Sequence, residues 1–364
     1  MAVRLHRLSC ALSLLGVFCA GSVAAQTYSK TEVYTYHDNT TIWVLGQTAS
    51  VTCAASLPVS EACDGDIVSA TAFDPTYALP VTQSAFGRVV NTYAYETGVP
   101  VGSDQRGTLK SLTDAGGHAT TFTLWKRGIP QRWAYADSTF QTAQVDNLGN
   151  IDWIKDELGK TTSYSYDPMG RITRVTYPVG DTTAWNDMNS AFVSVATAEY
   201  GLAAGHWRET VSTGTATTVR YYDALWRPVL ARQYDSANVA GTQSFVKTTF
   251  NSAGQPTFQS YPSASSTPAT GTWTGYDSLG RVTSVGQDTE LTPSLQVTTT
   301  EYLANFQTKV TNPRGFSTTT SFQAYDQPSN EAPVLMVLPE GVTTTIIRDP
   351  FGAPLSITRS GPSG

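Results

Sequence analysis

The chain has 364 residues, of which 14 % are charged and 11 % are aromatic. This composition excludes an intrinsically disordered protein, and the length suffices for one large or two ordinary domains. The net charge of −6 argues against nucleic acid or an anionic membrane as the main partner. Threonine and serine are frequent and long helical stripes are hard to find, so we expect an all-β fold.

Residues 1–25 have the features of a signal peptide. Arg4 and Arg7 precede the short apolar run ALSLLGVFCA, and small residues at Val23 and Ala25 fit the cleavage rule. A membrane anchor is the less favoured alternative, because the apolar run is too short to span a bilayer comfortably. Removal of the leader changes the net charge to −8, since it carries two arginines and no acidic residue. We expect a secreted or cell-surface protein without a membrane span.

Residues 26–100 are expected to form an N-terminal β segment. Its two cysteines, Cys53 and Cys63, lie in VTCAASLPVSEACDGD, and the other two cysteines of the chain belong to the leader. In an exported protein we expect them to form a disulfide, which stabilises one local loop by about 2–3 kcal/mol. Two free thiols are the alternative. Asp64 and Asp66 resemble part of a calcium loop but lack its remaining ligands, so we expect no metal site.

Residues 101–180 contain a repeat with a step of 21 residues. One set of glycines recurs at this step: Gly107, Gly128, Gly149 and Gly170. A second set lies between them in the same phase: Gly117, Gly159 and Gly180. The local rule is Asp or Asn, two further residues, and Gly. The predicted structural turns are those of Asp104, Gly107, Asp146, Gly149, Asp167, Gly170, Asp277, Gly280, Asp349 and Gly352.

The spacing of this repeat predicts β-hairpins. Asp or Asn at the first position of a type I turn accepts a backbone N–H, and Gly supplies the positive φ that ends such a turn. The flanking segments alternate with period two: Tyr164 and Tyr166 point to one side, and Ser163 and Ser165 to the other. A single hairpin is marginal in water, so we expect the hairpins to stabilise one another in an extended array.

The second half of the chain is less regular. Residues 181–215 break the period and are predicted to form a loop insertion or a longer hairpin, the first place to look for a contact surface. Residues 216–364 return to the repeat at wider spacing, with Trp226 in the glycine place of the Asp223 copy. We expect further repeats beyond Gly364.

These segments resemble the YD repeats of RHS (rearrangement hot spot) proteins. The resemblance lies in YSYDPMGRITRVTYP, TGYDSLGRVTSVG, RYYDALWRPVLARQY and IIRDPFGAPLSITRSG, and it extends from about Tyr34 to Gly361. It implies an antiparallel sheet of repeated hairpins that curls into part of an RHS-type β-shell. In bacterial members of this family the shell commonly encloses a C-terminal toxin domain, and other relatives are cell-surface, adhesion or carbohydrate-binding proteins.

We find no constellation for catalysis. Outside the leader the histidines are His37, His118 and His206, which are far apart and show no metal-ligand spacing. Motifs for a nucleophile elbow, a phosphate loop or a dinucleotide are absent, so we expect no cofactor. The eight tryptophans either fill the sheet interface or form a sugar-stacking platform: Trp43, Trp125, Trp133, Trp153, Trp185, Trp207, Trp226 and Trp273.

The expected function is that of an exported, non-enzymatic scaffold. The resemblance implies a polypeptide cargo or a downstream toxin domain as the partner. A cell-surface adhesion or glycan-binding protein of the same fold is the first alternative. A glycoside hydrolase that uses two repeat carboxylates is the least favoured one, because turns already explain the repeated Asp residues.

Overall fold

The computed structural model describes residues 28–57, 63, 65–100, 102–180, 182–325 and 329–361. These residues contain 26 β-strands in an antiparallel sheet and one short helix, α1 (Val239–Thr242). The predicted all-β fold of repeated antiparallel hairpins is confirmed. The predicted signal peptide lies outside the described residues. In the part that is described, no helix has the length and apolarity needed to cross a membrane.

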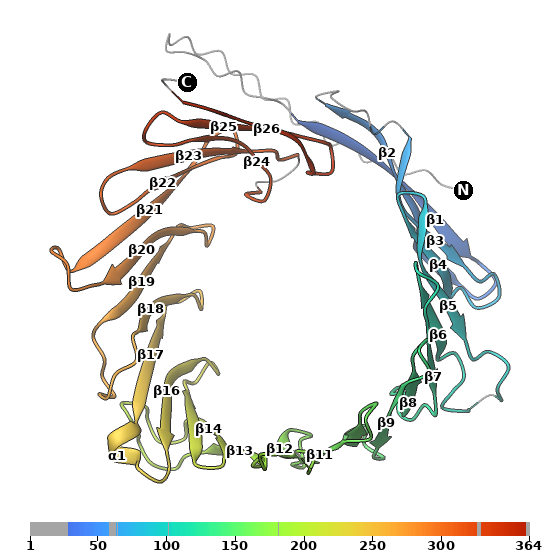
Figure 1. Cartoon of the computed structure of the whole chain (residues 1–364), viewed down its shortest axis with the longest axis horizontal. Coiled ribbons are helices and arrows are strands. Elements are labelled where there is room, and N and C mark those ends of the chain that lie inside the picture. The colour runs from blue at the N-terminus through green and yellow to red at the C-terminus, as the bar shows by residue number, and fades with distance from the viewer. Residues whose placement is uncertain are drawn as a thin grey trace. The chain divides into compact units, whose positions relative to one another are not determined.

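The chain divides into two compact units. Figure 1 labels their strands and colours them in chain order. Unit 1 comprises Met1–Ala94, Ser111–Ala119 and Thr299–Gly364, and unit 2 comprises Tyr95–Lys110 and Thr120–Thr298. Four strands cross the unit boundaries: β5 (Arg88–Tyr95), β6 (Leu109–Asp114), β7 (Ala119–Thr123) and β21 (Leu295–Leu303).

Unit 1 is built from the first and the last hairpins of the chain. Its strands are β1 (Ser29–Asn39), β2 (Val44–Leu57), β3 (Asp66–Phe73), β4 (Pro80–Ala85), β5 (Arg88–Tyr95), β22 (Gln307–Thr311), β23 (Ser317–Phe322), β24 (Pro333–Val337), β25 (Thr343–Arg348) and β26 (Pro354–Ser360). Within β1 to β5 and within β22 to β26, each strand pairs with the next one.

Aromatic side chains join the two ends of unit 1. Tyr28 meets Tyr325 edge to face with ring centroids 6.2 Å apart, and Phe86 meets Phe351 in the same way at 5.0 Å. The ammonium of Lys30 lies 5.4 Å from the Tyr325 ring centre and 5.8 Å from that of Phe351. Edge-to-face rings and a cation over an aromatic face are both attractive, so these contacts hold the first strand against the last turns.

Unit 2 is a continuous series of neighbouring strands. They are β8 (Arg132–Ala134), β9 (Phe140–Val145), β10 (Ile151–Lys155), β11 (Thr161–Tyr166), β12 (Ile172–Thr176), β13 (Met188–Ser194), β14 (Trp207–Thr213), β15 (Ala216–Tyr222), β16 (Pro228–Asp235), β17 (Ser244–Phe250), β18 (Pro256–Ser260), β19 (Gly271–Tyr276) and β20 (Val282–Asp288). Helix α1 connects β16 to β17. Because successive strands run in opposite directions, turns after odd-numbered strands lie at one edge and turns after even-numbered strands at the other.

The strands form where β-branched and aromatic residues alternate with polar ones. In β15, Thr217, Val219 and Tyr221 are buried while the residues between them are more exposed, as the period of two requires. A buried cluster forms around this strand: Val219, Tyr221, Leu230 and Phe245, with Leu202 and Tyr234 packed against it.

Strands β13 and β14 form a long hairpin within residues 182–215. Strands β13 and β14 pair over seven successive positions, from Met188 opposite Thr213 to Ser194 opposite Trp207. The loop between them, Val195–His206, extends beyond the strand ends and supplies Leu202 to the buried cluster. The period breaks because this connection is long, while the sheet itself continues through the segment.

Cys53 and Cys63 are joined by the predicted disulfide. Both side chains are completely buried, and their Cα atoms are 5.5 Å apart. The bridge links strand β2 to the start of β3, where Gly65 donates its N–H to the Cys53 carbonyl at 2.9 Å. The predicted calcium-like pair includes Asp64, which lies outside the described residues. Among the residues that are described, no group of three His, Cys, Asp or Glu side chains could hold a metal ion.

Candidate functional site

A repeated turn gives this sheet its most regular chemical feature. In the Asp277 copy, Asp277 Oδ1 accepts the backbone N–H groups of Leu279 and Arg281, both at 2.9 Å. Its other oxygen, Oδ2, accepts the Arg281 guanidinium through Nε and Nη2, both at 2.7 Å. The Gly280 N–H closes the turn on the Asp277 carbonyl at 3.0 Å. One carboxylate therefore fixes the turn backbone and the side chain that follows it.

The same arrangement, which we call the turn clamp, recurs with interchangeable partners. Its first residue is Asp or Asn, and the residue four positions later supplies the side-chain contact: Asp146 with Asn150, Asp167 with Arg171, Asp223 with Arg227, and Asn251 with Gln255. These clamps follow β9, β11, β15 and β17 and therefore share one edge of unit 2 with the Asp277 clamp. The predicted turns at Asp146, Asp167 and Asp277 are all members of this set.

The Asp349 turn in unit 1 has only the backbone half of the clamp. Asp349 Oδ1 accepts the N–H groups of Phe351 and Ala353, and Gly352 has a φ of 90°. Ala353 stands in the fifth position and has no polar side chain to offer. Arg348, the last residue of β25, supplies a side-chain contact to this turn in place of the missing one and donates to the Gly352 carbonyl at 2.5 Å.

The Asp104 turn differs from the prediction in its hydrogen bonds. Gly107 has a φ of 77°, yet its N–H donates to the Glu96 carbonyl at 2.7 Å and not to Asp104. The Glu96 N–H donates in turn to the Thr108 carbonyl at 2.9 Å. The reason is position: Asp104 lies inside the wide connection between β5 and β6, whereas the clamped turns begin directly after a strand.

Replacement of Gly170 by Val is expected to destabilise the protein. Gly170 has a φ of 77°, in the left-handed region that a β-branched residue avoids, and its turn lies close to Asn150. We expect the free energy of unfolding to fall by about 1–2 kcal/mol or more. Denaturant unfolding measures this loss. Gly170→Asn is the control, because Asn tolerates this region; an unchanged unfolding midpoint in Gly170→Val would contradict the turn geometry.

The clamps make the stability of the protein depend on pH. The backbone N–H of Arg281, followed by its guanidinium, holds the pKa of Asp277 below its ordinary value of 3.8. A carboxyl with a lowered folded pKa stabilises the protein above its unfolded pKa and loses that contribution as the pH falls through the folded value. Asp167 has a lowered pKa for the same reason.

We therefore expect Asp277→Asn to lower stability near neutral pH and to lower it less as the pH falls below the ordinary pKa of 3.8, towards the lowered pKa of the folded carboxyl. Urea unfolding of both proteins between about pH 3 and pH 6 measures the difference. Asn251→Ser is the matched control, since that clamp holds no carboxylate and its effect should not change with pH. An Asp277→Asn effect of equal size at both ends of the range would contradict the clamp.

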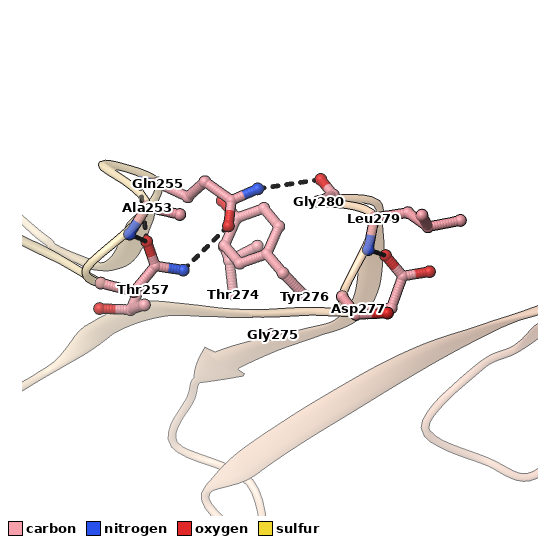
Figure 2. Close-up of a pocket in the computed structure, with 11 residues that line it drawn as sticks. Ala253, Gln255, Thr257, Thr274, Gly275, Tyr276, Asp277, Leu279 and Gly280 are labelled. Carbon is pink, nitrogen blue, oxygen red and sulfur yellow. Dashed lines mark hydrogen bonds between the residues drawn. The ribbon is translucent and has the colours of Figure 1, made fainter.

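Neighbouring clamps on this edge of unit 2 also bind one another. Gln255 donates from its turn to the Gly280 carbonyl at 3.0 Å, as Figure 2 shows, and Tyr276 donates to the Pro256 carbonyl at 2.8 Å. Tyr166 makes the equivalent bond to the Ile151 carbonyl at 2.8 Å. The tyrosines before Asp167 and Asp277 thus link their turns to the preceding one, whereas Tyr222, before Asp223, donates to Glu209 at 3.2 Å. An open groove of about 540 Å³ lies between the Asn251 and Asp277 turns.

The loop Val195–His206 forms a second feature on the same edge. Glu199 binds Arg208 at 2.9 Å and lies 3.5 Å from His206 Nε2, while His206 Nδ1 donates to the Ala203 carbonyl at 2.8 Å. These contacts fold the loop back on the sheet. Tyr200 then lies at its tip, in the left-handed region with a φ of 50°.

Aromatic packing attaches this loop to the buried cluster. The Tyr200 ring centre is 5.1 Å from that of Tyr221 and 5.5 Å from that of Phe245. Burial raises the pKa of Tyr221 to about 12, so its hydroxyl stays neutral at physiological pH. A pocket of about 360 Å³ opens beside Tyr200, with Arg227 and Lys247 among its lining residues. The Arg227 guanidinium already binds Asp223, so the pocket combines apolar walls with the ammonium of Lys247 and suits an apolar segment that carries negative charge.

The opposite side of β14 and β15 carries a stack of three rings. Phe192 lies 5.2 Å from Trp207 and 5.6 Å from Trp226, and the two tryptophans are 5.2 Å apart. Trp226 occupies the glycine place of its turn at a φ of 62°, which is strained for a large side chain. Stacking on two rings offsets that strain and explains why a tryptophan is accepted where the other copies have glycine.

The histidines fulfil structural roles. His37 stacks on Phe73 with ring centres 5.1 Å apart, and the exposed His118 contacts the Asp114 carboxylate of its own turn at 3.1 Å. The sequence reasoning found the Asp and Gly of each turn but not the fifth residue that completes the clamp. The sequence does contain a pattern for this fifth residue: Arg follows Gly in two of the clamped turns, and Arg follows Trp226 in a third.

The comparisons with known proteins agree with this geometry. The family described as RHS Repeat matches residues 146–182, the segment from the Asp146 clamp through β12. The chain contains an RHS repeat. The predicted resemblance to RHS and YD-repeat proteins is therefore confirmed, and the clamp of Asp167 is a feature of this RHS repeat. Comparison with curated proteins gives no match.

The chain also resembles several solved structures at low identity. They include TcdB2–TccC3 with Cdc42 and TcdB2–TccC3 alone, both at a TM-score of 0.32 and 10 % identity, covering 91 % and 90 % of this chain. The Tc holotoxin pore of Photorhabdus luminescens matches at a TM-score of 0.23 and 11 % identity over 92 % of the chain. The chain spans about a fifth of the length of the first two structures and 23 % of the third.

Proposed function

We propose that this chain is an exported, non-enzymatic YD-repeat scaffold, part of an RHS-type β-shell that encloses or presents a polypeptide cargo. The observation that carries the proposal is the series of clamped turns along one edge of unit 2, which includes the RHS repeat. Each clamp holds one hairpin and contacts the next, so such a sheet can be lengthened by adding hairpins. An array of this kind can build a wall around another molecule.

The surface of the sheet supports a role in covering another polypeptide. Many large apolar side chains are exposed along the described strands and turns, and few are fully buried. Exposed apolar surface of this extent is typical of proteins that contact a partner. The pocket beside Tyr200 is the most specific contact point, since it is lined by apolar groups together with Arg227 and Lys247. The cargo would be either a separate protein or a toxin-like domain of the same polypeptide.

The engagement of the carboxylates supports a non-enzymatic role. In the clamps, both carboxylate oxygens of Asp167, Asp223 and Asp277 already accept hydrogen bonds from their own turns. A general acid or a nucleophile needs at least one oxygen directed at a substrate. Export is supported by the leader-like first 25 residues and by the Cys53–Cys63 bridge, which persists in oxidising compartments.

Cross-linking within the complete natural polypeptide tests the proposal. A photo-reactive phenylalanine analogue replaces Tyr200 at the pocket or, as the control, the exposed Leu158 at the opposite edge. We expect the probe at Tyr200 to cross-link to a cargo segment that mass spectrometry identifies, and the probe at Leu158 to give no such product. Two results together would contradict the proposal. The secreted protein would contain or retain no cargo polypeptide, and the probes at Tyr200 and Leu158 would react alike.

A further inference from the structure

Two long connections of unit 2 approach strand β17 from opposite edges of the sheet. The loop Val195–His206 leaves the edge that carries the clamps, and residues 261–270 connect β18 to β19 at the other edge. The first connection contacts Phe245 of β17 through Tyr200, with ring centres 5.5 Å apart. The second pairs with the backbone of Phe245 through Ser263, in two hydrogen bonds of 2.7 and 3.0 Å. Both connections are therefore held against the same strand.

The pocket beside Tyr200 lies between these two connections. Its volume is about 360 Å³, and Ser266 lines it from the second connection. The strands contribute Val229 and Leu230 of β16 and Phe250 of β17. Leu230 is only 5 % exposed, so one wall of the pocket belongs to the buried cluster. The volume lies within the range of roughly 300–1,000 Å³ that is typical of small-molecule sites.

Lys247 brings a positive charge to this apolar pocket. It is the middle residue of β17 and lies opposite Leu230 of β16. The period of two places its side chain on the same face as Phe245, which is only 3 % exposed. Within the described part of the chain, the ammonium takes part in no ion pair and no side-chain hydrogen bond. A half-buried cation among apolar groups favours an anion that can reach it.

The other basic residue of the pocket already has partners. The Arg227 guanidinium donates to Asp223 Oδ2 through Nε at 2.8 Å and through Nη2 at 2.6 Å. Its Nη1 donates to the Asn251 carbonyl at 3.4 Å, and the group lies 4.9 Å from the Phe250 ring centre. None of the described residues that line the pocket is acidic. The pocket thus combines one available positive charge with apolar walls.

These groups select an amphiphilic ligand with a single negative charge. A carboxylate accepts the N–H donors of an ammonium in charge-assisted hydrogen bonds. An aliphatic chain gains free energy when its methylene groups are buried against the apolar walls. A cationic head group would be repelled by Lys247, and a second negative charge would remain unpaired among apolar side chains.

We propose that the pocket formed by Leu202, Val229, Leu230, Lys247 and Phe250 binds an aliphatic monocarboxylate. The carboxylate binds the Lys247 ammonium, and the alkyl chain lies against the apolar side chains. This inference goes beyond the proposed function, because it concerns a small ligand that the chain binds by itself, whether or not a cargo polypeptide is present.

Calorimetric titration of the whole chain with octanoate tests this site. We expect a Kd of about 1 mM or lower. Hexanoate, which lacks two methylene groups, should bind about tenfold more weakly. Acetate retains the charge without the chain, and octylammonium retains the chain with the opposite charge. Neither should bind at concentrations up to about 20 mM.

Three lysine variants locate the charge that binds octanoate. Lys247→Met keeps a long apolar side chain without the ammonium and should weaken octanoate binding about tenfold or more. Lys247→Arg keeps the charge and should retain the affinity within about threefold. The matched control is Lys155→Met, which removes an exposed lysine from β10, outside the pocket, and should bind octanoate as the wild type does. Thermal melting of each variant confirms that it is folded.

Equal octanoate affinities of folded Lys247→Met and the wild type would overturn the proposal. So would equal binding of octylammonium and octanoate, equal affinities for hexanoate and octanoate, or the absence of octanoate binding by the folded chain. These results do not depend on a cargo, so they are distinguishable from a failure of the cross-linking experiment at Tyr200.

Discussion

Replacement of Phe245 by Ala is expected to lower the free energy of unfolding by about 3–5 kcal/mol. Phe245 is only 3 % exposed and belongs to the cluster of Val219, Tyr221 and Leu230. Removal of the ring leaves a cavity that the surrounding β-strands cannot close, because their backbones are held in register by hydrogen bonds. Denaturant unfolding, monitored by tryptophan fluorescence, measures the loss.

Phe316→Ala is the matched control for this substitution. Phe316 is 54 % exposed in the turn that follows Asn312, so its removal should change the free energy of unfolding by less than about 0.5 kcal/mol. Phe245→Ala should also loosen the loop that packs on the ring through Tyr200. Faster hydrogen exchange at the Leu202 N–H, which is bonded to Glu199, would report this. Equal effects of the two alanine substitutions would contradict the buried cluster.

Loss of the Cys53–Cys63 bridge is expected to destabilise the chain by about 2–3 kcal/mol. The bridge closes a loop with a sequence separation of 10 and ties β2 to the start of β3. Without it the unfolded chain gains the freedom of that loop. The double variant Cys53→Ala with Cys63→Ala preserves an apolar side chain at two completely buried positions, so its unfolding measures the bridge more cleanly than serine would.

Reduction of the wild-type protein provides an independent check on the disulfide. A thiol reductant should lower the unfolding midpoint of the wild type towards that of the double alanine variant, and it should leave the variant unchanged. Because the sulfurs are buried, reduction should be slow until the segment around β2 opens. A wild-type midpoint that does not respond to complete reduction would show that the bridge does not contribute to stability.

The local parts of this fold were predictable from the sequence. Asp167 and Gly170 interact across three positions, and the alternation around Tyr164 and Tyr166 spans only a few residues. A turn satisfies its own backbone groups within such a stretch, so the pattern of residue types suffices to predict it. Cys53 and Cys63 were predictable for a similar reason, since they are the two cysteines outside the leader and lie close together in sequence.

The predictions were less successful where a contact joins distant segments. The Asp104 turn follows the same four-residue rule as Asp167, yet Gly107 bonds to Glu96 because the connection around it is wide. Residues 181–215 were predicted as a loop insertion or a longer hairpin, but the packing of Tyr200 on Phe245 was not, because these two residues lie 45 positions apart in sequence.

The sequence by itself determined the repeating unit: a strand, a turn that begins with Asp or Asn, and a second strand. It could do so because the carboxylate, the glycine and the alternating side chains all act within one hairpin. The tertiary structure decided which turns share an edge and which turns contact one another. Those outcomes depend on contacts between hairpins, such as Tyr276 with Pro256 and Gln255 with Gly280, and only the paired strands bring these residues together.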